Sequence, residues 1–595
     1  MVSQAWPQDV FKGWLLPLVA GMLTFPGGCG PRQIEMPPVP PVVEASPPLP
    51  TMRFETSMNL AEAAIRYRNG SESQRNAILE SLGGGVGVVD FDLDGALDLC
   101  FPGGGGFVGE TIQGEASRLM RQQGPDLFED VTEAALLNMG LHYSHGCAVA
   151  DFNGDGFPDL LITGYGGLTL WVNLGDGTFM DGTAEAGLDD TGWSSSAAWG
   201  DFNGDGVLDL YVTHYVNWSL ANDPVCNGPS GAADVCPPRR FEGVNDTLYL
   251  GQGDGTFVDA STPSGLVAGG KGLGVVAVDL DHDGDLDLYV ANDTTPNFYY
   301  NNTGNGIFRE EGLASGLALD DMGTANGSMG LAILDYDGDR LPDLGVTNYE
   351  GELFALYRNL GGGVFQHSSR MTGLNRIGNL FVGFGCVAGD FNANGHEDIA
   401  IANGHVVHHP LNAPVKQLPL LLANRGSGKF ERIEPALTGD YFNTPSLGRG
   451  LATGDIDRDG LLDLVFVNTN DPAALLYNRS QKVVEANRPR GLHLRLVGTA
   501  SNRDALGAWG ELETTEGSQV RHLSGGGSYL STSELALHWH WASEVAPRQL
   551  IVHWPSGLVS SIPWTKIPAN GESCLHCLLV EPRNAAEEPR ILILY

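Results

Sequence analysis

An acidic loop recurs seven times along the chain between Asp90 and Asp463. The copies read DFDLDGALDL, DFNGDGFPDL, DFNGDGVLDL, DLDHDGDLDL, DYDGDRLPDL, DFNANGHEDI and DIDRDGLLDL. Six intervals separate the first copy from the last, which gives an average repeat of about 61 residues. One unit of this length cannot bury its own apolar faces, so neighbouring units must stack. The repeat therefore restricts the chain to an array of similar units before any single residue is interpreted.

Positions 1, 3, 5 and 9 of every copy hold Asp or Asn, whose side-chain oxygens are ligands for hard cations. The candidate metal ligands are Asp90, Asp92, Asp94 and Asp98; Asp151, Asn153, Asp155 and Asp159; Asp201, Asn203, Asp205 and Asp209; Asp279, Asp281, Asp283 and Asp287; Asp335, Asp337, Asp339 and Asp343; Asp390, Asn392, Asn394 and Asp398; and Asp455, Asp457, Asp459 and Asp463. Position 6 is Gly in six copies, which permits a sharp turn with positive φ. A single copy would be explained as an Asp/Gly-rich surface turn, but seven copies with four fixed positions favour metal binding. We expect up to seven Ca²⁺ ions, because Mg²⁺ prefers fewer protein ligands and retains more water.

The end of each loop distinguishes it from an EF-hand, which requires a bidentate Glu at position 12. Position 12 is instead apolar in all seven copies, and so is position 10. Apolar residues at a period of two predict a strand that leaves the loop. The closing carboxylate is therefore the Asp at position 9.

Two copies depart from the common pattern. The copy at Asp390 has Asn at positions 3 and 5 and so supplies only two carboxylates, which predicts the weakest site. The copy at Asp335 has Arg340 where the others have Gly, and a non-Gly residue is strained there if φ is positive.

A Gly-rich hairpin that ends in Phe follows most loops, as in WVNLGDGTF, YLGQGDGTF, YNNTGNGIF, YRNLGGGVF and LANRGSGKF. With the strands on either side of the loop, each repeat has about four strands, which is the content of a propeller blade. The last loop, at Asp455, lacks the Phe tail, whereas an unpaired tail stands at Phe54. We expect this N-terminal strand to complete the last blade and cover its edge. The predicted fold is all-β, a seven-bladed β-propeller with a small C-terminal β domain.

The loop with its tail resembles the FG-GAP/VCBS repeat of integrin-type propellers over most of residues 52–483. Farther on, GLHLRLVGTASNRDALGAWGELET, GGGSYLST and VHWPSG resemble the ASPIC/UnbV domain. The whole chain is similar to the bacterial cartilage-acidic-protein-like family. The resemblance implies a Ca²⁺-loaded extracellular propeller and no settled ligand or reaction. The segment LALHWHWASEV departs from the glycine-containing segment expected in that domain.

The chain divides into four predicted parts. Residues 1–29 read as a signal peptide, because an apolar run too short to span a bilayer follows Lys12. Pro-Gly-Gly-Cys resembles a lipoprotein cleavage box with Cys29 as the lipidated residue, although Pro26 stands where Leu is usual. Residues 30–50 form a Pro-rich linker, residues 51–483 the FG-GAP/VCBS propeller, and residues 484–595 the ASPIC/UnbV-like β domain.

Formal net charge is -39, and 24 of the 72 acidic residues occupy the loop ligand positions. The charge is thus mainly a signature of metal sites, and without a basic patch it argues against nucleic acid as a partner. Cys226 and Cys236 bracket a long insertion and predict a disulfide in an oxidising compartment. These features predict a secreted or lipid-anchored protein of the periplasm or cell surface, which contacts a membrane only through the anchor.

No established catalytic motif occurs in the chain, so we expect a binding or adhesion module for an extracellular protein or glycan. Two alternatives stay open: an enzyme acting on a polysaccharide or glycoside with its site on one propeller face, and a scaffold that binds a partner through the insertion. Paired carboxylates outside the seven loops would favour the enzyme. His405, His408 and His409 are a candidate metal or catalytic group, although exposed loop histidines are the commoner explanation of such a run. Four tryptophans in the second and third repeats are expected to pack between blades, with sugar stacking as the alternative: Trp171, Trp193, Trp199 and Trp218.

Overall fold

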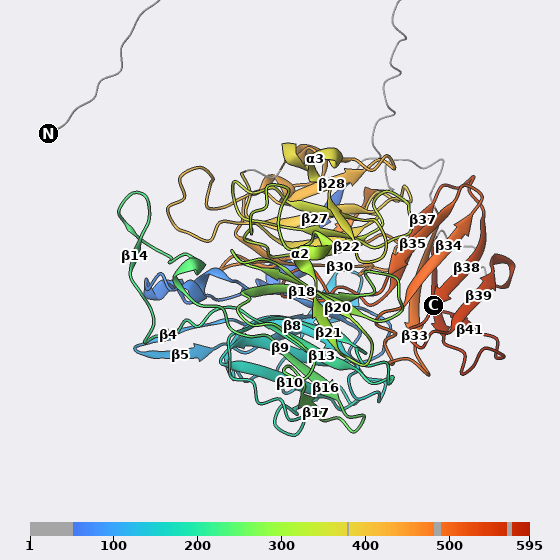
Figure 1. Ribbon diagram of the computed structural model, residues 1–595, viewed down its shortest axis with the longest axis horizontal. Helices are drawn as coiled ribbons and strands as arrows, with labels where there is room; N and C mark the ends of the chain where they lie inside the picture. The colour runs from blue at the N-terminus through green and yellow to red at the C-terminus, as the bar shows by residue number, and fades with distance from the viewer. Residues whose placement is uncertain (1–51, 378–379, 481–489, 568–573, 595) are drawn as a thin grey trace, which may run out of the picture. The chain divides into compact units, whose positions relative to one another are not determined.

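The computed structural model describes residues 52–377, 380–480, 490–567 and 574–594. The predicted signal peptide, Cys29 and the predicted linker lie outside these residues. From Phe54 to Asn478 the chain forms seven successive antiparallel sheets, and Figure 1 labels several of their strands. Two further four-stranded sheets follow. The predicted fold class, a seven-bladed propeller with a small C-terminal β domain, is confirmed.

Each blade has four strands in a simple up-and-down order. Blades 1 to 3 comprise β2 (Gly87–Val89), β3 (Asp98–Phe101), β6 (Arg118–Gly124) and β7 (Leu127–Asp130); β8 (Tyr143–Ala150), β9 (Asp159–Tyr165), β10 (Gly167–Asn173) and β11 (Phe179–Asp181); and β12 (Ser194–Gly200), β13 (Asp209–His214), β16 (Thr247–Gly251) and β17 (Phe257–Asp259). Blades 4 and 5 comprise β18 (Gly272–Val278), β19 (Asp287–Asn292), β20 (Phe298–Asn302) and β21 (Phe308–Glu310); and β22 (Leu331–Leu334), β23 (Asp343–Val346), β24 (Ala355–Asn359) and β25 (Phe365–His367). Blades 6 and 7 comprise β26 (Gly383–Gly389), β27 (Asp398–Asn403), β28 (Leu420–Asn424) and β29 (Phe430–Arg432); and β30 (Gly448–Gly454), β31 (Asp463–Asn468), β32 (Ala474–Asn478) and β1 (Phe54–Thr56).

The N-terminal strand closes the ring. β1 pairs antiparallel with β32, with Phe54 opposite Asn478, so the seventh blade is built from both ends of the propeller sequence. The first strands of the blades contact one another in the cyclic order β2, β8, β12, β18, β22, β26, β30 and back to β2. This confirms the prediction from the unpaired Phe tail, and it leaves no blade edge open at the chain ends.

Helices are few and short, and the remaining small strands lie in loops. The α-helices are α1 (Met58–Ala63), α2 (Gly312–Ser315) and α3 (Ser369–Thr372). The 3₁₀ turns are η1 (Ser71–Ser73), η2 (Ile78–Ser81), η3 (Pro238–Arg240), η4 (Leu374–Arg376), η5 (Pro435–Leu437), η6 (Tyr441–Asn443) and η8 (Trp564–Lys566), and the small hairpins are β4 (Gly105–Val108) with β5 (Thr111–Gly114) and β14 (Cys226–Asn227) with β15 (Ala233–Asp234). Among the described residues, none of these helices has the length and hydropathy to span a lipid bilayer.

An amide side chain at the end of the third strand ties each of six blades to the preceding one. Its nitrogen donates to the backbone carbonyl of loop position 2 in that blade, over 2.8–3.1 Å. The donor and acceptor pairs are Gln122 with Ile456, Asn173 with Phe91, Asn302 with Phe202, Asn359 with Leu280, Asn424 with Tyr336, and Asn478 with Phe391. Blade 3 has Gly251 at this position and makes no such bond. We call these residues the latch amides.

Replacing a latch amide is expected to destabilise the ring. Asn302→Ala removes donors to Phe202 O at 2.8 Å and Leu286 O at 3.0 Å, and both carbonyls are buried. An unpaired buried polar group costs about 1–3 kcal/mol, so the loss in unfolding free energy should be at least about 2 kcal/mol. Denaturant unfolding measures it, with Thr303→Ala at the exposed neighbouring position as control. Equal stability of the two variants would contradict the role of the latch.

The C-terminal domain consists of two sheets that share a core. One sheet has the order β37 (Leu537–Trp541), β33 (Arg490–Val497), β40 (Cys574–Val580) and β41 (Arg590–Ile593). The other has the order β35 (Ser518–His522), β34 (Trp509–Thr514), β38 (Pro547–His553) and β39 (Val559–Pro563). Leu494, Leu512, Trp539 and Leu550 are fully buried between them, and their cluster continues into blades 2 and 3 of the propeller.

A loop of the C-terminal domain enters the axis of the propeller. This axial plug, residues 525–532, lies between β35 and β37 and contains β36 (Gly525–Gly526), which pairs with β18. It contacts the first strand, or the residues that flank it, in every blade: Thr532 with Val86 and Val88, Leu530 O with Cys147 N, Leu530 N with Ser196 Oγ, Gly526 with Val276, Ser528 with Leu331, the Tyr529 ring with Phe384, and Ser528 Oγ with Leu451 O. The seven blades therefore close around a segment that comes from the other domain.

Candidate functional site

All seven acidic loops lie between the first and second strands of their blades, so they share one face of the propeller. The Asp at position 9 is the first residue of each second strand and is at most 1% exposed. Its Oδ1 accepts a backbone N–H from the end of the third strand over 2.7–2.9 Å in every blade. The main chain thus fixes the closing carboxylate before any cation is considered.

The carboxylate at position 1 shapes the turn. It accepts the backbone N–H of position 6 over 2.7–3.3 Å in all seven loops. Position 6 has positive φ in every copy, from 76° to 99°. The backbone conformation therefore favours Gly at this position, as the sequence predicted, although Arg340 adopts it in one copy.

Four loops bring three carboxylates together. In the loops that begin at Asp90, Asp279, Asp335 and Asp455, one oxygen from each of three aspartates lies within 4.8 Å of the other two. Some loop oxygens are buried without a hydrogen-bond donor: Asp159 Oδ2, Asp337 Oδ1, Asp455 Oδ1 and Asp457 Oδ1. Such oxygens require a cation or a proton, and carboxylates at this spacing are ligands for a hard divalent ion. These groups could hold a metal ion.

Burial makes the closing carboxylates difficult to ionise without a counter-ion. It raises the pKa of Asp98 and of Asp159 to about 8, that of Asp209 to about 7 and that of Asp343 to about 9, and the neighbouring loop aspartates add to the shift. A bound divalent cation reverses this effect by stabilising the charged form.

Arginines in the third strands, or directly after them, already contact three of the loops, although the acidic repeat does not point to them. Arg121 lies 2.5 Å from Asp92, Arg358 lies 2.5 Å from Asp337, and Arg479 lies 2.6 Å from Asp457. Each guanidinium also contacts the aspartate at position 5. They reduce the repulsion at the rims of these loops. In the sequence, each of these arginines stands directly beside a latch amide, and this position could have identified them.

The loop at Asp390 holds itself together through its own amides. Asn392 Nδ2 donates to Asp398 Oδ2 at 2.9 Å, and Asn394 Nδ2 donates to Asn424 O at 3.1 Å. A side chain of the C-terminal domain, His540, has its Nδ1 3.4 Å from Asp390 Oδ2. The contacts of Asn392 and His540 engage carboxylate oxygens that a cation would use, and the weakness of this site stays a prediction.

The loop at Asp335 carries the strain expected from its sequence. Arg340 has φ 76°, and its guanidinium lies 3.4 Å from Glu511 in a largely exposed position. We expect Arg340→Gly to raise the unfolding free energy by about 1 kcal/mol, because it relieves the left-handed conformation at little electrostatic cost. Thermal unfolding of the Ca²⁺-saturated variant tests this, with Arg358→Gly in the neighbouring strand as the destabilising comparison. An unchanged or lower unfolding temperature for Arg340→Gly would contradict it.

The C-terminal domain covers the loop face. Arg495 Nη1 lies 3.0 Å from Asp90 Oδ2, the backbone N–H of Asp151 donates to Asp504 at 2.7 Å, and His576 Nε2 lies 2.8 Å from Asp455 Oδ2. Position 1 of several loops is therefore shared between the two domains, which couples the order of the loops to the docking of the C-terminal domain.

A second site lies at the opposite mouth of the ring. A cavity of about 290 Å³, which we call the axial cavity, is lined by residues that follow the second strands, such as Tyr215, Asp293 and Tyr349. Because the acidic loops precede those strands, the cavity lies on the other face. Tyr529 of the axial plug lines it from the centre, and aliphatic side chains such as Met329 line its wall.

Two carboxylates outside the acidic loops line this cavity. Asp293 accepts a hydrogen bond of 2.6 Å from the Tyr215 hydroxyl, and burial raises the pKa of Asp293 to about 6. Glu352 accepts the backbone N–H of Gly327 at 2.8 Å, and burial raises its pKa as well. The sequence could not show that these two residues converge, because they lie in different blades.

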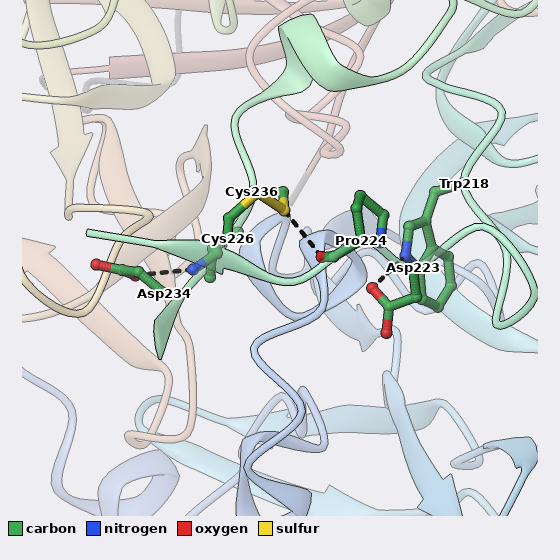
Figure 2. The surroundings of a disulfide bond; sticks show 7 residues. Trp218, Asp223, Pro224, Cys226, Asp234 and Cys236 are labelled. Carbon is green, nitrogen blue, oxygen red and sulfur yellow. Dashed lines mark hydrogen bonds between the residues drawn. A yellow bond between two sulfur atoms is a disulfide. The ribbon is translucent and has the colours of Figure 1, made fainter. Parts of the chain in front are cut away.

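The insertion in blade 3 borders the same cavity. Cys226 and Cys236 form a disulfide, and Trp218 Nε1 donates to Asp223 at 2.9 Å beside it (Figure 2). Asp234 then accepts the backbone N–H groups of His408 and His409, at 2.8 and 3.0 Å. The insertion thus reaches from blade 3 to the HVVHHP segment that follows the second strand of blade 6.

The other candidates from the sequence have structural roles. His405 is buried with its Nε2 3.4 Å from Glu350, and the exposed His408 and His409 bind the insertion through their backbone, so the three imidazoles do not form one site. The four tryptophans are at most 4% exposed, which agrees with packing and not with sugar stacking.

Comparison with known families assigns the two parts of the chain. The profile of the FG-GAP-like repeat matches residues 90–162, 151–212, 240–290, 279–346 and 335–401, and the profile of ASPIC and UnbV matches residues 498–576. The chain is an FG-GAP repeat protein with an ASPIC/UnbV domain. The family resemblance inferred from the loops and tails is confirmed, and the axial plug belongs to the ASPIC/UnbV part.

Among the distant relatives of the FG-GAP repeat protein are vertebrate cartilage acidic proteins. Cartilage acidic protein 1 of Mus musculus is 24% identical over 341 residues, which are 55% of this chain and 48% of the relative. Cartilage acidic protein 1 of Xenopus tropicalis is 27% identical over 320 residues, which are 51% and 44%. The chain thus spans about half the length of the curated relatives it matches.

Among solved structures, one similar chain is an Agrocybe aegerita lectin that recognises non-reducing terminal N-acetylglucosamine. It is 15% identical with a TM-score of 0.38, over 67% of this chain and 95% of the lectin. A likeness at this level bears on neither the ligand nor the reaction of the FG-GAP repeat protein.

Proposed function

We propose that this protein is an extracytoplasmic binding module, stabilised by Ca²⁺, for a protein or a glycan. The observation that carries the proposal is the axial cavity, which is lined by blades 3 to 6, by residues 78–82 ahead of blade 1, by the insertion and by the plug. Its walls are largely apolar, with a few polar groups from Tyr215, Asp293, Tyr349 and Glu352. Concave sites of this composition are typical of small-ligand binding. At about 290 Å³ the cavity would take the terminal group of a larger ligand.

Ca²⁺ in the acidic loops would hold the blades that frame this cavity. Each ion binds only the folded loop, so the metal stabilises the ring by mass action. Extracellular modules bind Ca²⁺ with Kd of roughly 10⁻⁴–10⁻³ M, a range that suits an extracytoplasmic compartment. The disulfide of the insertion supports the same location, because disulfides persist in oxidising compartments. Secretion by the N-terminal segment and lipidation at Cys29 remain part of the proposal.

A glycan array and a pull-down in excess Ca²⁺ test the proposal. The informative variant is Met329→Trp, which fills the axial cavity from a wall position that is 4% exposed. Its matched control is Met322→Trp, at a 74% exposed position. We expect binding by the wild type, at least a tenfold loss in Met329→Trp and no change in the control. Binding that Met329→Trp leaves intact would place the ligand elsewhere, and no binding to any glycan or protein would contradict the proposal.

An enzyme that acts on glycosides is the second candidate, and one observation favours it. Asp293 and Glu352 line the same cavity, and burial raises the pKa of both, as general acid–base chemistry requires. Release of reducing ends from polysaccharides tests this reading. Loss of the activity in Asp293→Asn and in Glu352→Gln, with Glu350→Gln as a control outside the cavity, would support it. No release by the wild type from any polysaccharide would contradict it.

A further inference from the structure

Three histidines form a row across the first sheet of the C-terminal domain. His493 on β33 lies opposite His538 on β37 and beside His576 on β40, so the three side chains share one face of the sheet. The ring centroids of His493 and His538 are 4.5 Å apart, and those of His493 and His576 are 4.9 Å apart. Each side chain is at most 11% exposed. Three adjacent buried imidazoles are an unusual set for a purely packed core.

A carboxylate closes the row. Glu534 follows the axial plug, and its Oε1 lies 2.7 Å from His493 Nε2 while its Oε2 lies 3.3 Å from His538 Nε2. One ligand atom from each of the three residues lies within 4.8 Å of the other two. Two ligands on a tetrahedral Zn²⁺, at about 2.0–2.1 Å from the ion, are about 3.3 Å apart. The observed spacing therefore needs little adjustment to accept such an ion.

The group also has unused ligand capacity and open space. His538 Nε2 is buried and has no hydrogen-bond partner, although it points at the Glu534 carboxylate. A cavity of about 260 Å³ is lined by His493, Glu534 and His576, and by Asp455 and Arg495. An ion held by the histidines and the glutamate would therefore keep room for a further ligand on the cavity side.

We propose that His493, His538 and Glu534 bind a divalent transition-metal ion of the Zn²⁺ class, at a site separate from the acidic loops. Two imidazole nitrogens and one carboxylate suit Zn²⁺, whereas Ca²⁺ takes oxygen ligands. His576 contacts Asp455 at 2.8 Å and links this site to the seventh acidic loop. The proposal does not depend on the ligand of the axial cavity.

The test uses the full chain in excess Ca²⁺, so that the acidic loops are saturated before a second metal is added. Calorimetric titration with Zn²⁺ should then give one equivalent of tight binding. Co²⁺ should give the intense visible absorption of a site with nitrogen ligands and low coordination number. Three variants test the ligands: His493→Gln, His538→Gln and Glu534→Gln. Each should weaken Zn²⁺ binding at least about 10–100-fold, because loss of a contact that merely supports a metal ligand already has an effect of this size.

A matched control is His553→Gln, which removes a histidine of the same domain that stacks on Trp509. It should leave the Zn²⁺ titration unchanged, and thermal unfolding in Ca²⁺ verifies that each variant is folded. The Co²⁺ spectrum of the wild type keeps the test decisive if a variant does not fold. No Zn²⁺ uptake by the Ca²⁺-saturated wild type would overturn the proposal. Weak absorption typical of oxygen ligands alone, or Zn²⁺ binding unaffected in the folded variants, would overturn it equally.

Discussion

Removal of Ca²⁺ with a chelator is expected to lower the unfolding free energy by several kcal/mol. At a Ca²⁺ concentration tenfold above Kd, mass action contributes about 1.4 kcal/mol per site, so seven independent sites would give an upper bound on the order of 10 kcal/mol. The bound is not reached, because Arg121, Arg358 and Arg479 already offset charge in three loops and amides hold the Asp390 loop. Thermal and denaturant unfolding with and without EDTA measure the effect.

Two variants locate the effect in particular loops. Asp287 and Asp398 both occupy position 9, are fully buried and accept two backbone N–H groups. Asp287 also accepts the Tyr299 hydroxyl, whereas Asp398 accepts the amide of Asn392 from its own loop, which has only two carboxylates. Asp287→Asn should therefore reduce the stabilisation by Ca²⁺, and Asp398→Asn should leave it nearly unchanged. An unfolding curve that is insensitive to EDTA in the wild type would refute Ca²⁺ binding by the loops.

Truncation of the plug at Tyr529 is expected to be the most damaging single substitution. The side chain is fully buried, its ring packs at 5.0 Å on Phe384, and its hydroxyl donates to Leu82 O at 3.1 Å. Tyr529→Ala leaves a cavity at the axis and should cost about 3–5 kcal/mol. Tyr529→Phe leaves only the Leu82 carbonyl unpaired and should cost about 1–3 kcal/mol.

Denaturant unfolding in excess Ca²⁺ measures both variants, with Leu592→Ala at an exposed position of β41 as the control. Limited proteolysis supplies a second readout, because a C-terminal domain that the plug no longer anchors should expose buried strands such as β33 to cleavage. If Tyr529→Ala unfolds like the control, the plug fills the axis without holding the ring.

The sequence determined the features that depend on local chemistry. The period of the acidic loops, the Gly at position 6 and the Phe-tailed hairpins predicted seven blades, and the unpaired tail at Phe54 predicted the strand that closes the ring. The strain at Arg340 was likewise readable from one position of the repeat. These predictions succeed because a turn or a strand is decided by residues within a few positions of one another.

Only the tertiary structure decided what meets across blades and between domains. The latch amides were visible in the tails, but the carbonyls that they bind belong to the preceding blade. The string GGGSYLST gave no sign that it enters the axis. No recognisable sequence spacing marks the group of His493, His538 and Glu534, or the pair Asp293 and Glu352. Such groups converge only through the register of paired strands and the closure of the ring. Register and closure are set by packing between residues that are far apart in the sequence, and not by the few residues that form each group.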